Sequence, residues 1–248
     1  MGSFTGLQAT SPATANTSIS VGMSTAAAGL QSGNVVLGFV SDGTGIAGDG
    51  TKTLLSNQNV AVTGNVFRLA TGSASPDPLN LGNFRLSSAT ATGSLDIKNS
   101  AANDGSSEQL GIQSVGASAG FTASSNLGAT RINAQATSTG AVGVGLGSGL
   151  VAGINTGTVT IQYLSDGTVS GTGAPINSNS QNVNVNATGY NMAVGSTTPT
   201  PVVLNARVGD TATQALTVAN TAVAGIYSEA LNANFSGATG SAGHNGVA

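Results

Sequence analysis

Asn34-Val-Val-Leu-Gly-Phe-Val-Ser-Asp-Gly-Thr44 decides the fold, because the chain repeats its pattern 124 positions later as Thr158-Val-Thr-Ile-Gln-Tyr-Leu-Ser-Asp-Gly-Thr168. In each copy apolar residues alternate with small or polar ones, which is typical of a half-buried β-strand. The Asp-Gly pair that follows predicts the turn that ends the strand. The stretch therefore indicates an internal repeat built from β-strands.

The composition favours one or two all-β domains with aliphatic cores. The chain has 248 residues, of which 39% are hydrophobic, 4% are aromatic and none is Trp. Val, Leu, Ile and Ala must therefore supply most of the packing. Only 6% of the residues are charged, far below the roughly 25% of an average soluble domain. Ser, Thr, Asn and Gln must supply the polar surface instead.

The charge pattern and the missing residue types exclude several functions. Six Lys and Arg against nine Asp and Glu give a net charge of −3, which offers no basic footprint for nucleic acid or anionic lipid. There is no cysteine, so disulfides and thiolate metal sites are impossible. No apolar run of about 18 residues exists, so we expect no membrane insertion. We also expect no cofactor. Met1 to Thr5 lack a signal region, and we expect this end to be a start inside a longer protein, or a processed or engineered end.

The repeat divides the chain into three predicted units. Residues 1–70 are the back half of a β-sandwich, 71–194 a complete sandwich, and 195–248 a front half. Pro76-Asp-Pro78 marks a boundary or the entry to an edge strand, since proline removes ladder donors, and it recurs as Pro199-Thr-Pro201.

Matching residues support the duplication of the front half. Three pairs keep the same spacing of 121 residues: Leu95 with Leu216, Asn99 with Asn220, and Glu108 with Glu229. Further alternating strands are predicted at 17–21, 58–67, 79–84 and 202–208, and the Gly-rich segment 41–50 is predicted to be a long loop.

Several motifs resemble the choice-of-anchor D repeats of large bacterial surface proteins, which are related to immunoglobulin-like modules of the Hydin type. Arg207-Val-Gly-Asp-Thr-Ala-Thr-Gln-Ala-Leu-Thr-Val-Ala-Asn-Thr-Ala222 is similar to the family's first strand pair. Val40-Ser-Asp-Gly-Thr-Gly45 and Val62-Thr-Gly-Asn-Val66 are similar to its turn and closing strand. The second repeat departs at Leu86-Ser-Ser-Ala89 and at Asn186-Ala-Thr-Gly189. The resemblance implies an extracellular, cell-surface array of β-sandwiches and no catalysis.

The predicted fold class is all-β, with tandem immunoglobulin-like sandwiches that are phase-shifted so that both termini are half-domains. A half-sandwich exposes unpaired strand edges and an apolar face. Either 195–248 folds back onto 1–70 of the same chain, or it completes 1–70 of a neighbouring copy. We favour the second, head-to-tail solution, which generates a homopolymer. The predicted assembly residues are Val35, Leu37, Phe39, Val60, Val62, Val203, Leu216, Val218 and Leu231.

The acidic turns offer weak candidates for a Ca²⁺ site. Asp42, Asp49 and Asp166 lie in Gly-rich segments whose carboxylates and carbonyls could hold the ion, although Asp-Gly also simply makes turns. The only histidine, His244, lies in a Gly-rich tail without an acidic neighbour. We therefore expect no enzyme activity.

The sequence as a whole predicts a structural subunit or repeat segment of an extracellular bacterial fibre, adhesin stalk or surface assembly. Strand complementation would join such segments head to tail. The alternative is a carbohydrate- or Ca²⁺-dependent ligand-binding adhesin module, whose receptor or glycan the sequence does not identify.

Overall fold

The computed structural model describes residues 3–10, 12–13, 15–45, 50–88, 90–240 and 242–243. Every regular element in these ranges is a β-strand, and there are fourteen of them. The prediction of an all-β protein is therefore confirmed. Within the same ranges no helix has the length and apolar character needed to cross a membrane.

A long hairpin forms the N-terminal unit. β1 (Gly29–Leu37) pairs with β4 (Gln58–Val66), and beyond a break the ladder continues as β2 (Val40–Asp42) with β3 (Lys52–Leu54). All of these pairings are antiparallel. The loop predicted from residue 41 begins later than expected, because Ser41 and Asp42 still find ladder partners in β3.

Two four-stranded sheets form the central unit. One has the order β5-β7-β10-β9 and the other β6-β12-β11-β8. All neighbours are antiparallel except β12 and β6, which run parallel. Pro76 to Pro78 lie between β5 and β6, where the chain crosses from one sheet to the other. The strands are β5 (Gly72–Ser75), β6 (Leu79–Arg85), β7 (Thr92–Asn99), β8 (Gln109–Ala117), β9 (Phe121–Ser125), β10 (Thr137–Leu146), β11 (Gly153–Asp166) and β12 (Ile176–Tyr190).

Alternate residues of the two sheets fill a single core between them. On β11, Val159, Ile161 and Tyr163 are fully buried, as the alternation in the repeated stretch predicts. Leu95 and Ile97 of β7 reach the same core from the opposite sheet. Two sheets whose inner faces share one aliphatic core make a β-sandwich.

The C-terminal unit has only one short hairpin. β13 (Gly195–Thr198) pairs antiparallel with β14 (Thr217–Asn220), and the residues after β14 form no further strand within the described part of the chain. Most of this unit is exposed. It therefore has no core of its own.

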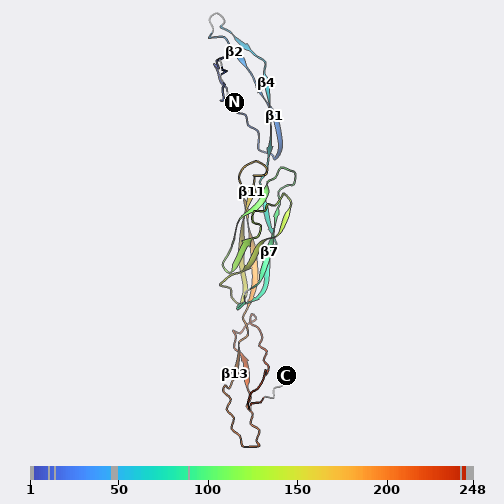
Figure 1. The fold of residues 1–248 in the computed structure, drawn as a ribbon, viewed down its shortest axis with the longest axis vertical. Coiled ribbons are helices and arrows are strands. Elements are labelled where there is room, and N and C mark those ends of the chain that lie inside the picture. The colour runs from blue at the N-terminus through green and yellow to red at the C-terminus, as the bar shows by residue number, and fades with distance from the viewer. Residues whose placement is uncertain are drawn as a thin grey trace.

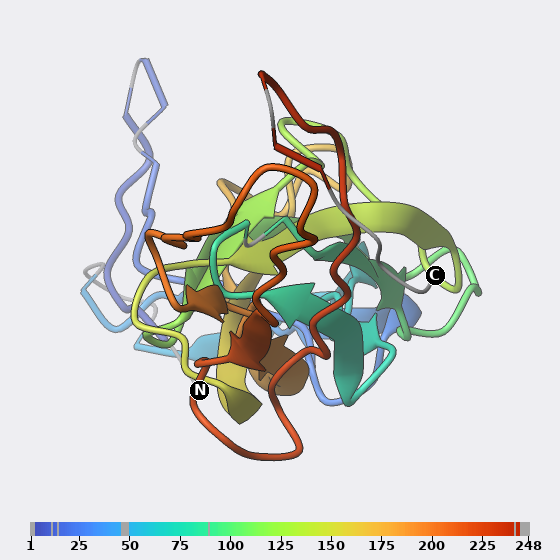
Figure 2. The same cartoon turned by 90° about the horizontal axis from the view of Figure 1, so that it is seen from below.

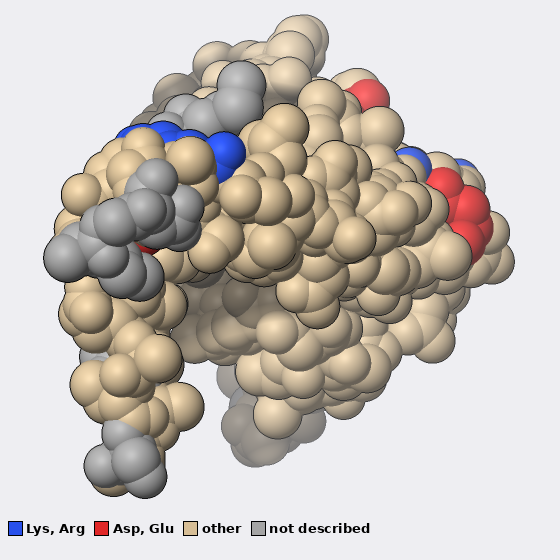
Figure 3. Space-filling model, turned by 90° about the horizontal axis from the view of Figure 1, so that it is seen from above, with Lys and Arg blue, Asp and Glu red and all other residues tan. Residues whose placement is uncertain are grey.

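The three units lie in line along the long axis of the molecule (Figure 1). The hairpin of β1 and β4 is at one end, the sandwich is in the middle, and β13 is at the other end. Seen along the axis, the C-terminal segment overlies the sandwich as open loops (Figure 2). Charged side chains are sparse on the face in Figure 3, as expected from the composition. The described parts of 1–70 and 195–248 thus share no sheet within one chain.

Two strand predictions are wrong for the single chain. Residues 17–21 and 202–208 form no ladder among the described residues. Both have the right pattern of side chains, but a strand also needs a neighbour that accepts and donates its backbone hydrogen bonds. The equivalent strands of the central sandwich, β10 and β6, pair with β7 and β12. In this chain the strands equivalent to β7 and β12 lie in the opposite terminal unit, too far away to pair with either segment.

Candidate functional site

A buried carboxylate joins the two halves of the central sandwich. Glu108 precedes β8, and its Oε2 atom accepts a hydrogen bond from the Ser165 hydroxyl of β11 at 2.7 Å. The Ser165 oxygen in turn accepts from the Ala70 N–H at 2.6 Å, and the Thr172 hydroxyl donates to Oε1 of Glu108. Glu108 and Ser165 are both buried. The front half (residues 79–126) and the back half (residues 127–194) of the sandwich are therefore fixed to each other by directional polar contacts as well as by the apolar core.

A buried amide organises the backbone at the end of β7. Asn99 is fully buried, and its Oδ1 atom accepts hydrogen bonds from the N–H groups of Thr71 at 3.3 Å and Ala101 at 3.1 Å. Its Nδ2 atom donates to the carbonyls of Glu108 at 3.2 Å and Ile132 at 3.1 Å. One side chain thus satisfies four backbone groups from four segments.

The N-terminal hairpin copies the register of the central one. Val35 of β1 lies opposite Val60 of β4, as Val159 lies opposite Val183 in the pairing of β11 with β12. Val35 and Val60 are half-buried, whereas Val159 and Val183 are fully buried. The hairpin therefore has the geometry of a sandwich edge without the opposing sheet.

The C-terminal hairpin copies the other half of the sandwich. Gly195 lies opposite Asn220, as Gly72 lies opposite Asn99 in the pairing of β5 with β7. Asn220 is exposed, whereas Asn99 is fully buried. The local backbone arrangement is thus already formed, but nothing in the described chain covers it.

The predicted assembly residues lie in these two terminal units, at opposite ends of the chain. The structure does not bring the two sets together. Each residue is half-buried or exposed: Val35, Leu37, Phe39, Val60, Val62, Val203, Leu216, Val218 and Leu231. The copies of all but Val203 are fully buried in the central sandwich: Val159, Ile161, Tyr163, Val183, Val185, Leu95, Ile97 and Leu110.

Val203 has a different kind of copy. It corresponds to Asn80, an exposed position of β6, whereas the buried Leu79 and Leu81 correspond to Val202 and Leu204. An apolar run such as Val-Val-Leu does not reveal which residue points inward. Alignment of the two Pro-x-Pro segments shows which residues of the run are equivalent to the buried ones. It identifies Val202 and Leu204 as the inward positions, which the alternation pattern alone does not predict.

The two described Ca²⁺ candidates occupy equivalent turns of different hairpins and do not lie together. Asp42 forms an ion pair with Lys52 at 2.9 Å, and Asp166 forms one with Arg131 at 2.6 Å. Each carboxylate also accepts hydrogen bonds from the Thr two residues on, Thr44 or Thr168. Asp49 and His244 lie outside the described residues. Among the described residues no three His, Asp or Glu side chains cluster as metal ligands would.

Asp166 predicts a pH dependence for the central sandwich. Hydrogen bonds from the Thr168 hydroxyl and N–H, followed by that from Arg131, lower the pKa of Asp166 from 3.8 to about 2. Since the folded pKa is depressed, the stabilisation is present above pH 3.8 and disappears as the pH falls toward 2. We expect Asp166→Asn to flatten the loss of melting temperature that calorimetry records in this window.

The matched control is Asp42→Asn, which removes the equivalent turn carboxylate from the N-terminal hairpin. The pKa of Asp42 is also lowered to about 2, with the Thr44 hydroxyl as the main cause. The melting of the central sandwich should keep its wild-type pH profile in this variant. An unchanged acid slope in Asp166→Asn would contradict the assignment.

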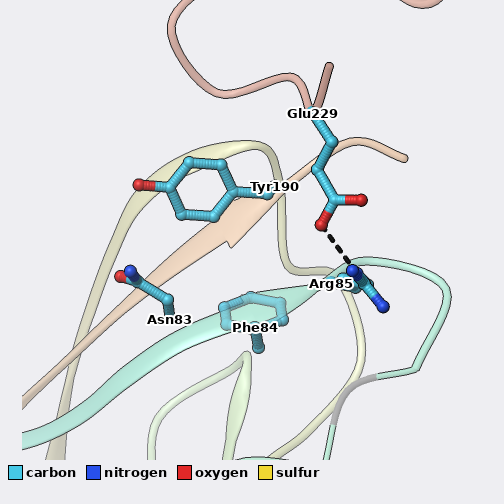
Figure 4. A pocket seen from close by; sticks show the side chains of 5 residues that line it. All are labelled: Asn83, Phe84, Arg85, Tyr190 and Glu229. Atoms are coloured by element: carbon cyan, nitrogen blue, oxygen red, sulfur yellow. Dashed lines mark hydrogen bonds and ion pairs between the residues drawn. The ribbon is translucent and has the colours of Figure 1, made fainter. Parts of the chain in front are cut away.

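An open pocket of about 370 Å³ lies at the junction between the central and C-terminal units. Its lining residues are Asn83, Phe84, Arg85, Tyr190 and Glu229 (Figure 4). The Arg85 Nε atom lies 2.6 Å from Glu229 Oε1, so the two charges of the pocket neutralise one another. Next to it the rings of Tyr190 and Tyr227 make an edge contact with their centroids 5.9 Å apart. These contacts hold the central and C-terminal units together at their junction. Because the two charges form an ion pair, the pocket has no net charge to attract an ionic ligand.

Comparison with known proteins gives no match, whether with protein-family models, curated proteins or solved structures. Function must therefore be inferred from the residues of this chain. Its most informative comparison is internal, because the terminal hairpins repeat the registers of the completed sandwich.

Proposed function

We propose that this chain is a structural repeat segment of an extracellular bacterial fibre, adhesin stalk or surface assembly. Its terminal half-sandwiches would be completed by β-strands of neighbouring copies, so that segments join head to tail. The chemistry is backbone hydrogen bonding and burial of aliphatic side chains, without a catalytic step.

The exposure of the predicted assembly residues carries this proposal. Val218 on β14 is 47% exposed, while its copy Ile97 on β7 is fully buried. Leu216 is 42% exposed, while its copy Leu95 is fully buried. Exposed apolar side chains on one face of a strand are typical of interfaces, because covering them removes apolar area from water.

The strand order of the central unit supports immunoglobulin-like repeats. With β5 as A, β6 as A′ and β7 to β12 as B to G, the sheets have the orders A-B-E-D and A′-G-F-C. Immunoglobulin-like sandwiches have A-B-E-D and C-F-G sheets. By the same naming the hairpin of β1 with β4 is F-G, and that of β13 with β14 is A-B.

The shape and the sequence motifs support a role as a surface stalk. Three units in line make an extended body (Figure 1), which suits a spacer better than a compact binding domain. The resemblance of Arg207 to Ala222 to choice-of-anchor D repeats favours a cell-surface location. Stability would rest on sheet ladders, since the sequence has no cysteine for disulfides.

Sedimentation velocity and electron microscopy over a concentration series test the proposal. We expect the wild-type chain to form linear oligomers and Val218→Lys to remain monomeric, because its ammonium group would enter the completed core. Ala219→Lys is the matched control, since the corresponding residue of the central sandwich is the exposed Lys98, and it should assemble. A wild-type chain that stays monomeric at high concentration would overturn the proposed function.

A further inference from the structure

The central sandwich shows what a completed terminal sandwich would look like. Residues 195–238 correspond to 72–117, which carry β5 to β8, and residues 3–66 correspond to 127–189, which carry β10, β11 and all but the last residue of β12. The two terminal segments together therefore contain the counterparts of seven of the eight strands of one sandwich. Four of these strands already exist, in the hairpins β1–β4 and β13–β14.

We propose that residues 195–238 of one copy and residues 3–66 of a second copy form one sandwich in the register of the central sandwich. This inference rests on the proposed head-to-tail assembly and specifies its interface. The occupant of each exposed half is thus the opposite end of another copy of this chain.

The first inferred contact extends the sheet of β13 and β14. In the central sandwich Val142 of β10 lies opposite Leu95 of β7. The corresponding residues are Ile19 of one copy and Leu216 of the other. Residues 17–21, which form no strand in the single chain, would then gain the ladder partner that they lack.

The second inferred contact adds a strand beside β1 in the same sheet. In the central sandwich Ile161 of β11 lies opposite Val115 of β8, which places Leu37 opposite Ser236. One residue earlier on β11, Thr160 lies opposite Gly116 of β8, which places Val36 opposite Gly237. Residues 230–238, which form no strand and are mostly exposed in the single chain, would become the strand equivalent to β8.

The third contact is parallel and explains the segment after the second Pro-x-Pro. Val185 of β12 lies opposite Leu79 of β6. The corresponding pair is Val62 of β4 and Val202 of the other copy. Val202 is 40% exposed in the single chain, and this pairing would turn it into the core.

A polar contact would fix this register. Ser165 joins Glu108 to the Ala70 N–H in the central sandwich. The corresponding groups are the Ser41 hydroxyl of one copy and the Glu229 carboxylate and Ala193 N–H of the other. Glu229 Oε1 already pairs with Arg85. In the inferred register its second carboxylate oxygen would accept a hydrogen bond from the Ser41 hydroxyl. A one-residue slip would turn Ser41 to the other face of its strand and break this bond, so the contact favours one register.

Disulfide trapping tests the register, because the chain has no cysteine of its own. Val36→Cys is prepared in one isotope-labelled chain and Gly237→Cys in an unlabelled one, so that no disulfide can form within a chain. Gly237 has nothing within 4 Å of an added Cβ atom, and Val36 is 57% exposed, so both variants should fold. After mixing and oxidation, mass spectrometry counts the disulfide-linked dimers that contain both chains.

We expect at least about tenfold more mixed dimer from this pair than from the control pair Val36→Cys with Ala233→Cys, because pairing raises the local thiol concentration only at matched positions. Ala233 lies four residues from Gly237, or about 13 Å along a strand, beyond disulfide reach. Linear oligomers with equal trapping of the two pairs would overturn the register and leave the assembly standing. Absence of oligomers in sedimentation would overturn the proposed function itself.

Discussion

Asn99→Ala is expected to lower the free energy of unfolding of the central sandwich by about 3 kcal/mol, because it leaves buried backbone groups without partners. The side chain is fully buried and serves two N–H groups and two carbonyls, of which the Ile132 carbonyl also accepts from the Leu110 N–H and keeps that bond in the variant. Each buried group left unsatisfied costs roughly 1–3 kcal/mol, and water can reach some of them after truncation. Calorimetry or denaturant unfolding of the whole chain gives the value.

Asn220→Ala is the matched control for that substitution. Asn220 Nδ2 donates to the Glu229 carbonyl at 3.0 Å, and Oδ1 accepts from the N–H groups of Val194 at 3.0 Å and Ala222 at 3.2 Å. These contacts repeat three of the four that Asn99 makes, but they are exposed, so water replaces them. We expect a change below about 1 kcal/mol in the monomer. Equal losses in the two variants would contradict a role for burial.

This pair of residues also shows how far the sequence predicts the structure. The spacing of Asn99 and Asn220 in the two copies is visible in the sequence, and the structure gives both the same local hydrogen bonds. Their different burial is not visible, because it depends on which other strands arrive from distant parts of the chain. Sequence similarity thus identifies equivalent positions, while tertiary packing decides their energetic weight.

The sequence predicts strands best where the chain contains both partners. Its repeat makes Val35 and Val159 equivalent, and the structure places them opposite Val60 and Val183 in the same register. Residues 17–21 have an equally clear alternation and form no strand. Alternation reports which face of a strand is apolar, whereas strand formation requires a hydrogen-bonded neighbour, and the pattern contains no information on that neighbour.

The candidate site was predictable as a set of positions but not as a surface. Eight of the nine assembly residues follow from the alternation in each copy, all except Val203, yet their exposure depends on the absence of an opposing sheet within the chain. The contact of Glu108 with Ser165 joins residues 57 positions apart, and no short motif indicates it. Only the folded central sandwich reveals that a carboxylate and a hydroxyl meet there.

Tyr163→Ala should cost the central sandwich about 3–5 kcal/mol, the usual range for removal of a fully buried aromatic side chain. Its ring packs so closely against β5 that a Cβ atom at Gly72 would lie 2.4 Å from it. The side chain is fully buried, and this burial raises the pKa of the Tyr163 hydroxyl. Thermal unfolding should show a large fall in melting temperature, and an unchanged value would contradict the packing.

Phe39→Ala removes the equivalent ring from the N-terminal hairpin, and the comparison separates folding from assembly. Phe39 is 37% exposed, so its loss should leave the melting of the central sandwich unchanged. In a completed sandwich the ring would lie beneath Gly195 of the next copy, as Tyr163 lies beneath Gly72. Burying a Phe side chain is worth about 1.5–3 kcal/mol, which corresponds to a roughly 10- to 100-fold weaker association of the variant. Sedimentation equilibrium measures that constant, and a Phe39→Ala chain that associates as tightly as wild type would show that this face of the hairpin lies outside the interface.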